Sequence, residues 1–151
     1  MIKVRLADRS DFAGIIQLMQ GYFLESTYGS HVDLEVDEAH ASKIMFAALH
    51  AGYIWIATDE LQVVGVLAVV REPNIWFPSK MSLRELFWYV AKEYRTSMAP
   101  GRLFVAYRTL AQDQLNKGNI QAYFMTEMAT TPGLNLESRG FRLAERLYIK
   151  D

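Results

Sequence analysis

The sequence predicts an α/β protein in which helices pack against a mixed β-sheet. Two observations favour this class. Segments with the alternating or β-branched pattern of strands occur on both sides of segments with the three-and-four apolar spacing of amphipathic helices. The apolar run over residues 63–70 has no polar face, as expected of a central strand that is covered on both sides. The expected order of elements is β-α-α-β-β-β-α-β-α-β.

Each element of the first half has a local signal. Asp8 and Ser10 are candidate caps of a first helix, and Asp37 is the expected cap of a second helix that stops at Gly52. A tight turn at residues 59–60 then joins two strands into a hairpin. The expected elements are a strand over residues 2–6, a helix with its apolar stripe from Phe12 to Phe23, a loop over 29–36, a helix after Asp37, and strands over 53–58 and 62–71.

The second half begins with a proline-containing loop over residues 72–82, which carries Trp76 and Phe77 as candidate contacts with an acceptor or partner. A long helix with apolar residues from Leu103 to Leu115 ends at Gly118. The other expected elements are strands over residues 82–91 and 120–128, a short helix beginning at Thr131, and a last strand over residues 141–149.

Length and composition indicate one globular domain over residues 1–151. Hydrophobic residues make up 51% of the chain and charged residues 22%, which is ordinary for a packed domain. The apolar runs are too short to span a bilayer, and the start of the chain has no signal-peptide pattern. We therefore expect a cytoplasmic protein, in the host cytoplasm if it is viral, with no membrane partner. The chain has no cysteine, which excludes disulfides and thiol nucleophiles.

Charge argues against nucleic-acid binding, because the net charge of −1 provides no general basic surface for phosphates. The two halves nevertheless differ. Residues 1–75 hold five Lys or Arg against ten Asp or Glu, and residues 76–151 hold eleven against seven. An anionic cofactor would suit the basic half and a cationic acceptor the acidic half.

The segment over residues 83–103 is the strongest candidate for a binding site. A strand that leads into a helix N-terminus presents unpaired N–H groups and the positive end of the helix dipole to an anion. Arg95 and Arg102 flank this junction, and Thr96 and Ser97 add hydroxyl groups, all of which suit a diphosphate. The alternative is an ordinary strand-to-helix connection with two solvated arginines.

The order of elements and these residues together resemble the GNAT superfamily of N-acetyltransferases. The resemblance rests on residues 4–8 with Asp11, on the strand over 64–66, on Tyr94-Arg95 and on the closing residues 137–141. It implies a GNAT-type acyl-CoA N-acyltransferase fold, acetyl-CoA as cosubstrate, and a bulge in the fourth strand near Tyr89 and Val90. The cofactor-binding residues that it implies are Tyr89, Val90, Arg95, Thr96, Ser97, Met98, Ala99, Gly101 and Arg102.

The chain departs from the family pattern at two places. The glycines of the family's Arg-x-x-Gly-x-Gly/Ala loop fall on Met98 and Pro100, and proline has no N–H to donate. Arginine-serine variants of this loop occur in divergent members of the family, phage-encoded ones included. The family's general-acid tyrosine falls on Leu136, for which Asn135 and Ser138 are the nearby substitutes.

Glu85 resembles the family's general base, which would deprotonate an ammonium directly or through one water. Its alternative role is that of a strand carboxylate paired with Arg84 or a lysine; Glu72 and Glu127 are weaker candidates. The histidines have no metal-ligand spacing, so no metal is expected. The resemblance implies an N-acetyltransferase of a small-molecule or protein amine, with a non-catalytic binding or inhibitory module as the alternative. The C-terminal edge strand is a candidate for pairing across a homodimer.

Overall fold

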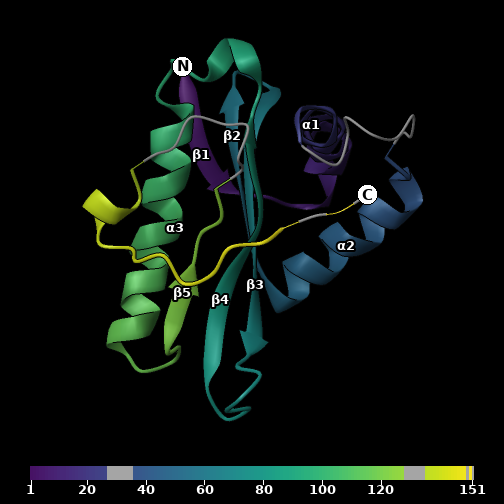
Figure 1. Cartoon of the computed structure of the whole chain (residues 1–151). Helices are drawn as coiled ribbons and strands as arrows, with labels where there is room; N and C mark the ends of the chain where they lie inside the picture. Colours follow the sequence, from purple (N-terminus) through teal and green to yellow (C-terminus); the bar gives the residue numbers. More distant parts are fainter. Residues whose placement is uncertain (27–35, 128–134, 149, 151) are drawn as a thin grey trace.

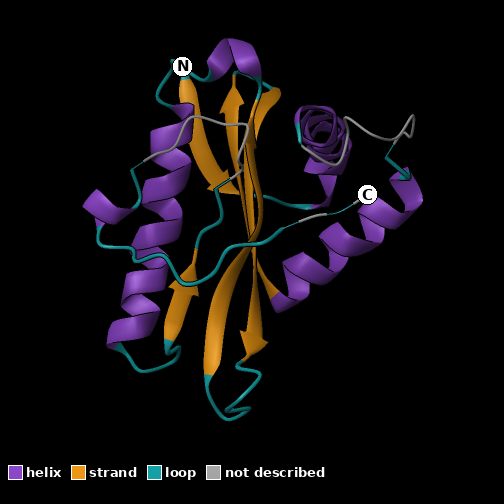
Figure 2. Cartoon of the chain, viewed as in Figure 1, coloured by secondary structure: helices purple, strands orange, loops and turns teal. Residues whose placement is uncertain are grey.

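The structure is a computed structural model that describes residues 1–26, 36–127, 135–148 and 150. A sheet lies between α3 on one face and α1 and α2 on the other (Figures 1 and 2). The strands are β1 (Ile2–Leu6), β2 (Gly52–Asp59), β3 (Gln62–Pro73), β4 (Met81–Val90) and β5 (Ala122–Phe124), and the helices are α1 (Phe12–Glu25), α2 (Glu38–Ala51) and α3 (Ala99–Asn116). Single 3-10 turns are η1 (Arg9–Asp11), η2 (Lys92–Tyr94) and η3 (Glu137–Arg139).

The sheet is mixed, with the strand order β1-β2-β3-β4-β5. β1 to β4 form antiparallel neighbours, whereas β4 and β5 run parallel. The β4–β5 pairing covers residues 82–84 and 122–124 alone. The predicted fold class is therefore confirmed.

The predicted caps Asp8 and Asp37 are both present: Asp8 caps the 3-10 turn η1, which leads directly into α1, and Asp37 caps α2. The Asp8 carboxylate accepts the Ser10 N–H at 2.8 Å, and Asp11 accepts the Asp8 N–H at 2.9 Å, which completes a capping box. Asp37 accepts the His40 N–H at 2.9 Å at the start of α2. α2 gives way to β2 at Gly52, where a Cβ would collide with the Val69 carbonyl oxygen.

β3 lies at the centre of the sheet and contributes to both faces. Leu67 packs in the cluster that contains Leu103 and Tyr107 of α3, and Val66 packs in the cluster that contains Ile15 of α1 and residues of α2. Residues 64–69 are all buried, which confirms the predicted central strand. No helix in the described ranges is long and apolar enough to cross a bilayer.

The predicted last strand is wrong over its described residues, 141–148, which join no sheet. The Phe141 ring packs instead on Phe104 and Tyr123, with centroid separations of 6.3 and 5.4 Å. β5 has three residues, so the edge with which a further strand could pair is short. Leu147, within the predicted strand, is 87% exposed. The strand proposed for dimer pairing is therefore not formed there. The predicted helix start at Thr131 lies outside the described residues.

Candidate active site

β4 has one fully paired edge and one open edge. On the β3 side its pairing runs from Met81 to Val90, whereas on the β5 side it stops at Arg84. Among the described residues, no strand pairs with the β5 side of β4 beyond that point. The register shift between Ala68 and Val69 leaves Leu86 as the extra residue of a bulge. The expected position of the bulge, near Tyr89 and Val90, is thus corrected to a point a few residues earlier.

Glu85 lies where β4 and β5 separate and is 5% exposed. Its Oε2 accepts the Thr126 N–H at 2.8 Å and also a hydrogen bond from the Thr126 hydroxyl. Burial raises the pKa of Glu85, and the hydrogen bonds from Thr126 oppose that rise without cancelling it. Arg84 pairs with Glu72 at 2.5 Å, so the alternative of a Glu85–Arg84 pair is not what the structure contains.

Tyr107 of α3 contacts both strands near the point where β4 and β5 separate. Its hydroxyl donates to the carbonyl of Phe124 in β5 at 3.0 Å and lies 3.4 Å from the carbonyl of Leu83 in β4. Burial, and then the charge of Glu85, raise the pKa of Tyr107, so the phenol stays protonated as a donor. Sequence reasoning missed both Tyr107 and Thr126. Tyr107 was visible as a member of an apolar helical stripe, and Thr126 carried no distinguishing signal.

The loop between β4 and α3 presents unpaired N–H donors. The Ser97 hydroxyl accepts the Ala99 N–H at 3.1 Å and donates to the Tyr94 carbonyl at 2.6 Å. Within the described part of the chain, the N–H groups of Thr96, Met98 and Gly101 make no hydrogen bond. These donors, at the positive end of an 18-residue helix, suit an anion. Pro100 provides no donor, and the N–H of Ala99 is already used by the Ser97 hydroxyl.

Arg95 turns toward α1. Its Nη2 donates to both oxygens of Glu25, at 2.9 and 2.7 Å, and its Nε donates to the Val90 carbonyl at 2.9 Å. The Tyr89 hydroxyl donates to Glu25 at 2.6 Å, and the Arg95 guanidinium lies 5.2 Å from the Tyr89 ring centroid. These contacts fasten the end of β4 to the end of α1. Nη1 is the nitrogen of Arg95 that keeps its donors for a ligand, because no described hydrogen bond uses it.

Glu25 is the charged centre of this cluster and was not predicted. Burial raises its pKa, but the hydrogen bonds from Tyr89 and Arg95 outweigh that effect, so the pKa of Glu25 lies below its ordinary value. Burial and the bond to Glu25 raise the pKa of Tyr89 to about 12. Gly21 leaves room for the contact, since a Cβ there would lie 2.7 Å from the Tyr89 hydroxyl. No local pattern in the sequence could predict the contact between Glu25 and Arg95, because the two residues are 70 positions apart.

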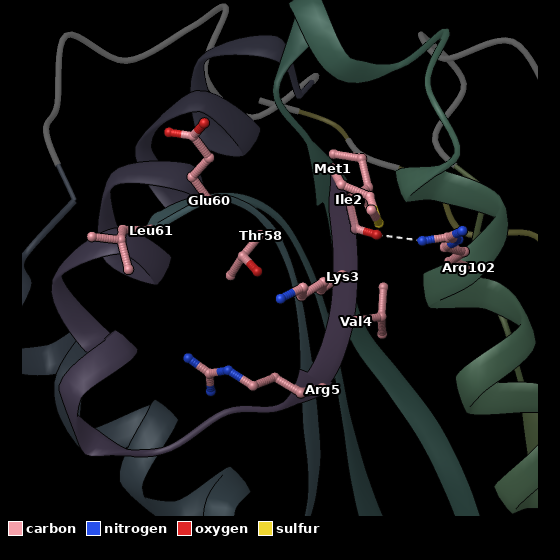
Figure 3. Close-up of a pocket in the computed structure, with 9 residues that line it drawn as sticks. All are labelled: Met1, Ile2, Lys3, Val4, Arg5, Thr58, Glu60, Leu61 and Arg102. Atoms are coloured by element: carbon pink, nitrogen blue, oxygen red, sulfur yellow. Dashed lines mark hydrogen bonds between the residues drawn. The ribbon is translucent and has the colours of Figure 1, made fainter.

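Arg102 contacts β1, whereas Arg95 contacts α1. Its Nη1 donates to the Ile2 carbonyl of β1, as Figure 3 shows. The contact lies beside a surface hollow of about 570 Å³ that is lined by β1, the β2–β3 turn and Arg102. The two predicted phosphate-binding arginines therefore have different partners within the chain, Glu25 for Arg95 and the Ile2 carbonyl for Arg102.

Asn135 lies in the turn that leads into η3. The turn packs on α3 through Arg139, whose guanidinium lies 5.3 Å from the Phe104 ring centroid, and Phe104 in turn stacks on Trp88 of β4. Its Oδ1 accepts the Ser138 N–H at 3.2 Å, and its carbonyl accepts the Ser138 hydroxyl at 2.8 Å. The two predicted substitutes for a general acid thus cap a short turn and bond to each other. The described residues contain no cluster of three His, Asp or Glu side chains that could hold a metal.

Comparison with known proteins adds information on the fold. No protein-family model and no curated protein sequence matches the chain. An acetyltransferase from Trypanosoma brucei is similar in structure, with a TM-score of 0.71, 17% identity, and coverage of 100% of this chain and 99% of that one. A GNAT family acetyltransferase from Staphylococcus aureus gives a TM-score of 0.65 at 15% identity, with coverage of 99% and 98%.

A third similar structure is that of a predicted acetyltransferase from Clostridium acetobutylicum with acetyl-CoA. Its TM-score is 0.70 at 13% identity, and the match covers 100% of this chain and 96% of that chain. The similarity extends over the whole chain in all three cases, at identities that establish the fold and not the substrate. The chain has the fold of the GNAT acetyltransferases.

Proposed function

We propose that this protein is an acetyl-CoA-dependent N-acetyltransferase that acts on an amine of a small molecule or protein. One observation carries the proposal. The open edge of β4 runs from the buried carboxyl group of Glu85 to the unpaired N–H donors at the start of α3. A ligand with a diphosphate at one end and a thioester at the other would match the two ends of this edge.

The residues divide the chemistry between them. The N–H groups of Thr96, Met98 and Gly101 would bind the diphosphate, and Arg95 would add its free Nη1 donors. Backbone groups on the open edge of β4 would hold the pantetheine arm. Glu85 would take a proton from the acceptor ammonium, so that the neutral amine attacks the thioester carbonyl. The carbon–sulfur bond would then break, and the second proton of the attacking nitrogen would reach the leaving thiolate through water, which gives the amide and the free thiol.

Titration calorimetry with acetyl-CoA tests the cofactor assignment. We expect binding by the folded chain, and an affinity about tenfold lower for Arg95→Ala, because that change removes a charge-assisted donor and the anchor of Val90. The matched control is Arg108→Ala, which removes an exposed arginine further along α3. A correctly folded chain that releases no heat with acetyl-CoA would refute the enzyme hypothesis.

The rate of acetyl transfer tests the proposed role of Glu85 as the general base. In a coupled thiol-release assay with a panel of amines, Glu85→Gln should reduce the rate on the accepted amine about 10²-fold or more. The affinity for acetyl-CoA should change little, because Gln keeps the size of the side chain. Equal rates for the two proteins would remove Glu85 from the mechanism.

The second candidate is a non-catalytic GNAT-fold module that binds or inhibits a partner. Met98 and Pro100 in place of the loop glycines, and Leu136 in place of the tyrosine, favour it. The structure adds a further reason, since Ser97 and Arg95 already have partners within the chain. Acetyl-CoA binding without turnover on any amine would support this second candidate.

A further inference from the structure

The loop between β3 and β4 exposes three consecutive large apolar side chains. Ile75, Trp76 and Phe77 are 84%, 77% and 60% exposed, at the end of the sheet where the β3–β4 hairpin turns (Figure 1). The other two tryptophans are shielded: Trp55 is 6% exposed and Trp88 is half-buried. Exposed apolar residues are normal when scattered singly, but a run of three on one tip indicates a contact surface.

Hydrogen bonds inside the loop fix its shape. The Asn74 Oδ1 accepts the N–H groups of Trp76 and Phe77, at 2.8 and 3.1 Å. The Asn74 N–H donates to the Lys80 carbonyl at 2.7 Å, and the Lys80 N–H donates to the Phe77 carbonyl at 2.8 Å. Because the loop that carries Ile75, Trp76 and Phe77 is already ordered, it loses little conformational entropy when these side chains bind another surface.

The size of the tip favours a lipid surface over a folded protein. Stable protein interfaces bury about 800 Å² on each partner and involve roughly 20–30 residues a side. Here the apolar run is three residues long, and the residues that follow it, 78–80, are exposed proline, serine and lysine. A bilayer needs no complementary surface, and tryptophan is enriched at the level of the lipid headgroups.

Charge at the same end favours an anionic lipid. The carboxylate of Glu72 is paired with Arg84 at 2.5 Å, and that of Asp113 is paired with Lys117 at 2.8 Å. Lys80 makes no ion pair among the described residues. Arg71 likewise has no carboxylate partner there, and its guanidinium donates to the Asn119 carbonyl at 3.1 Å. Two cations therefore remain uncompensated beside the apolar tip, which suits phosphate headgroups.

We propose that the β3–β4 loop binds the surface of an anionic bilayer, with Ile75, Trp76 and Phe77 inserted at headgroup level and Arg71 and Lys80 against lipid phosphates. The lack of long apolar runs led us to expect no membrane partner, but surface contact requires no spanning segment. The tip and the β4–α3 loop lie at opposite ends of β4 (Figure 1). The proposal is therefore independent of the proposed acetyl transfer.

Trp76 reports the contact directly, because it is the one tryptophan that is largely exposed in the described chain. With phosphatidylglycerol vesicles, the tryptophan emission should move to shorter wavelength and be quenched by brominated acyl chains. Trp76→Phe should lose that spectral change yet still sediment with the vesicles. Trp76→Ser combined with Phe77→Ser should lower the bound fraction about tenfold or more, since two apolar side chains are removed.

Three controls complete the experiment. Leu61→Ser removes a 99%-exposed leucine at the β2–β3 turn and should leave vesicle binding unchanged. Lys80→Gln should weaken binding to phosphatidylglycerol vesicles but not the residual binding to phosphatidylcholine vesicles. Circular dichroism should show that every variant is folded. The proposal is overturned if phosphatidylglycerol vesicles do not bind the chain, if the double serine variant binds equally well, or if sedimentation equilibrium shows that the tip joins two copies instead.

Discussion

The two edges of β4 have opposite characters. Along β3, β4 is paired to its end and lies between apolar clusters on both faces. Along β5, three residues are paired, and the groups at the point of separation are polar: Glu85, Thr126 and the hydroxyl of Tyr107. One strand thus completes the core with one edge and leaves backbone groups available with the other. The first edge supports folding, and the second is the edge at which we propose that the ligand binds.

The buried polar groups at the open edge stabilise the fold less than apolar side chains of the same volume would. A buried carboxyl group must be neutralised or hydrogen-bonded, and Glu85 depends on one neighbour, Thr126, for both of its described hydrogen bonds. The β3 edge has no such group: its buried side chains, such as Val64, Val66 and Leu67, are aliphatic. Three substitutions test this contrast.

The largest effect should come from the paired side. Leu67→Ala removes a fully buried side chain of the central strand and should lower the free energy of unfolding by about 3 kcal/mol, within the usual range of roughly 2–5. Urea titration measures the change. The matched control, Leu61→Ala at the exposed turn, should stay within about 0.5 kcal/mol of the parent protein. Similar losses for both leucines would show that β3 does not hold the main core.

A smaller loss of stability is expected when the contact of Tyr107 with β5 is removed. Tyr107→Phe removes the hydroxyl that bonds to the Phe124 carbonyl, and should destabilise the chain by about 1 kcal/mol because a backbone acceptor loses its donor. Amide exchange at residues 122–124 should accelerate more than exchange in β2 or β3. Uniform acceleration across the sheet would mean that Tyr107 stabilises the core in general and not the β4–β5 junction.

The smallest effect should be a pH dependence at the open edge. Thr126→Val removes the hydroxyl bond that lowers the pKa of Glu85, and so raises that pKa further above its ordinary 4.5. A carboxyl group with a raised folded-state pKa binds more protons when folded, so its stability contribution is lost as pH rises from about 4.5 through the folded pKa.

The variant should therefore lose stability relative to the parent as pH rises from the raised folded pKa of Glu85 in the parent to the higher folded pKa in the variant, and the difference should level off once Glu85 is ionised in both proteins. Chemical denaturation across the acid and neutral range measures it. Thr126→Ser, which keeps the hydroxyl, should follow the parent curve. A stability difference that is independent of pH would exclude an effect through Glu85.

Local patterns predicted most of the fold. The Asp8 and Asp37 caps, the end of α2 at Gly52 and the buried run in β3 each depend on residues near in sequence, and the structure confirms them. The predicted last strand over residues 141–149 is wrong in its described part, because residue types along one segment do not tell whether a partner edge exists. Residues 131–134, where the short helix was expected to begin, lie outside the described part.

The candidate site was predicted in part. Glu85 lies in the expected strand, and the β4–α3 loop lies in the expected place before α3; that they mark the two ends of an open edge was not predicted. Arg95, Arg102 and Asn135 could be placed in the chain but not oriented, and their side chains bond to Glu25, Ile2 and Ser138 respectively. Each of those partners is set by packing or by local turn geometry that residue type does not reveal.

The sequence by itself determined the order of the elements from β1 to β5, the caps, the central strand and the position of the β4–α3 loop, because periodicity and helix-end chemistry act over a few residues. The tertiary structure decided which edge of β4 stays open, which carboxylate holds Arg95, and that Ile75, Trp76 and Phe77 are left uncovered. These outcomes depend on contacts between residues far apart in the chain, whose energies are settled when the layers pack together.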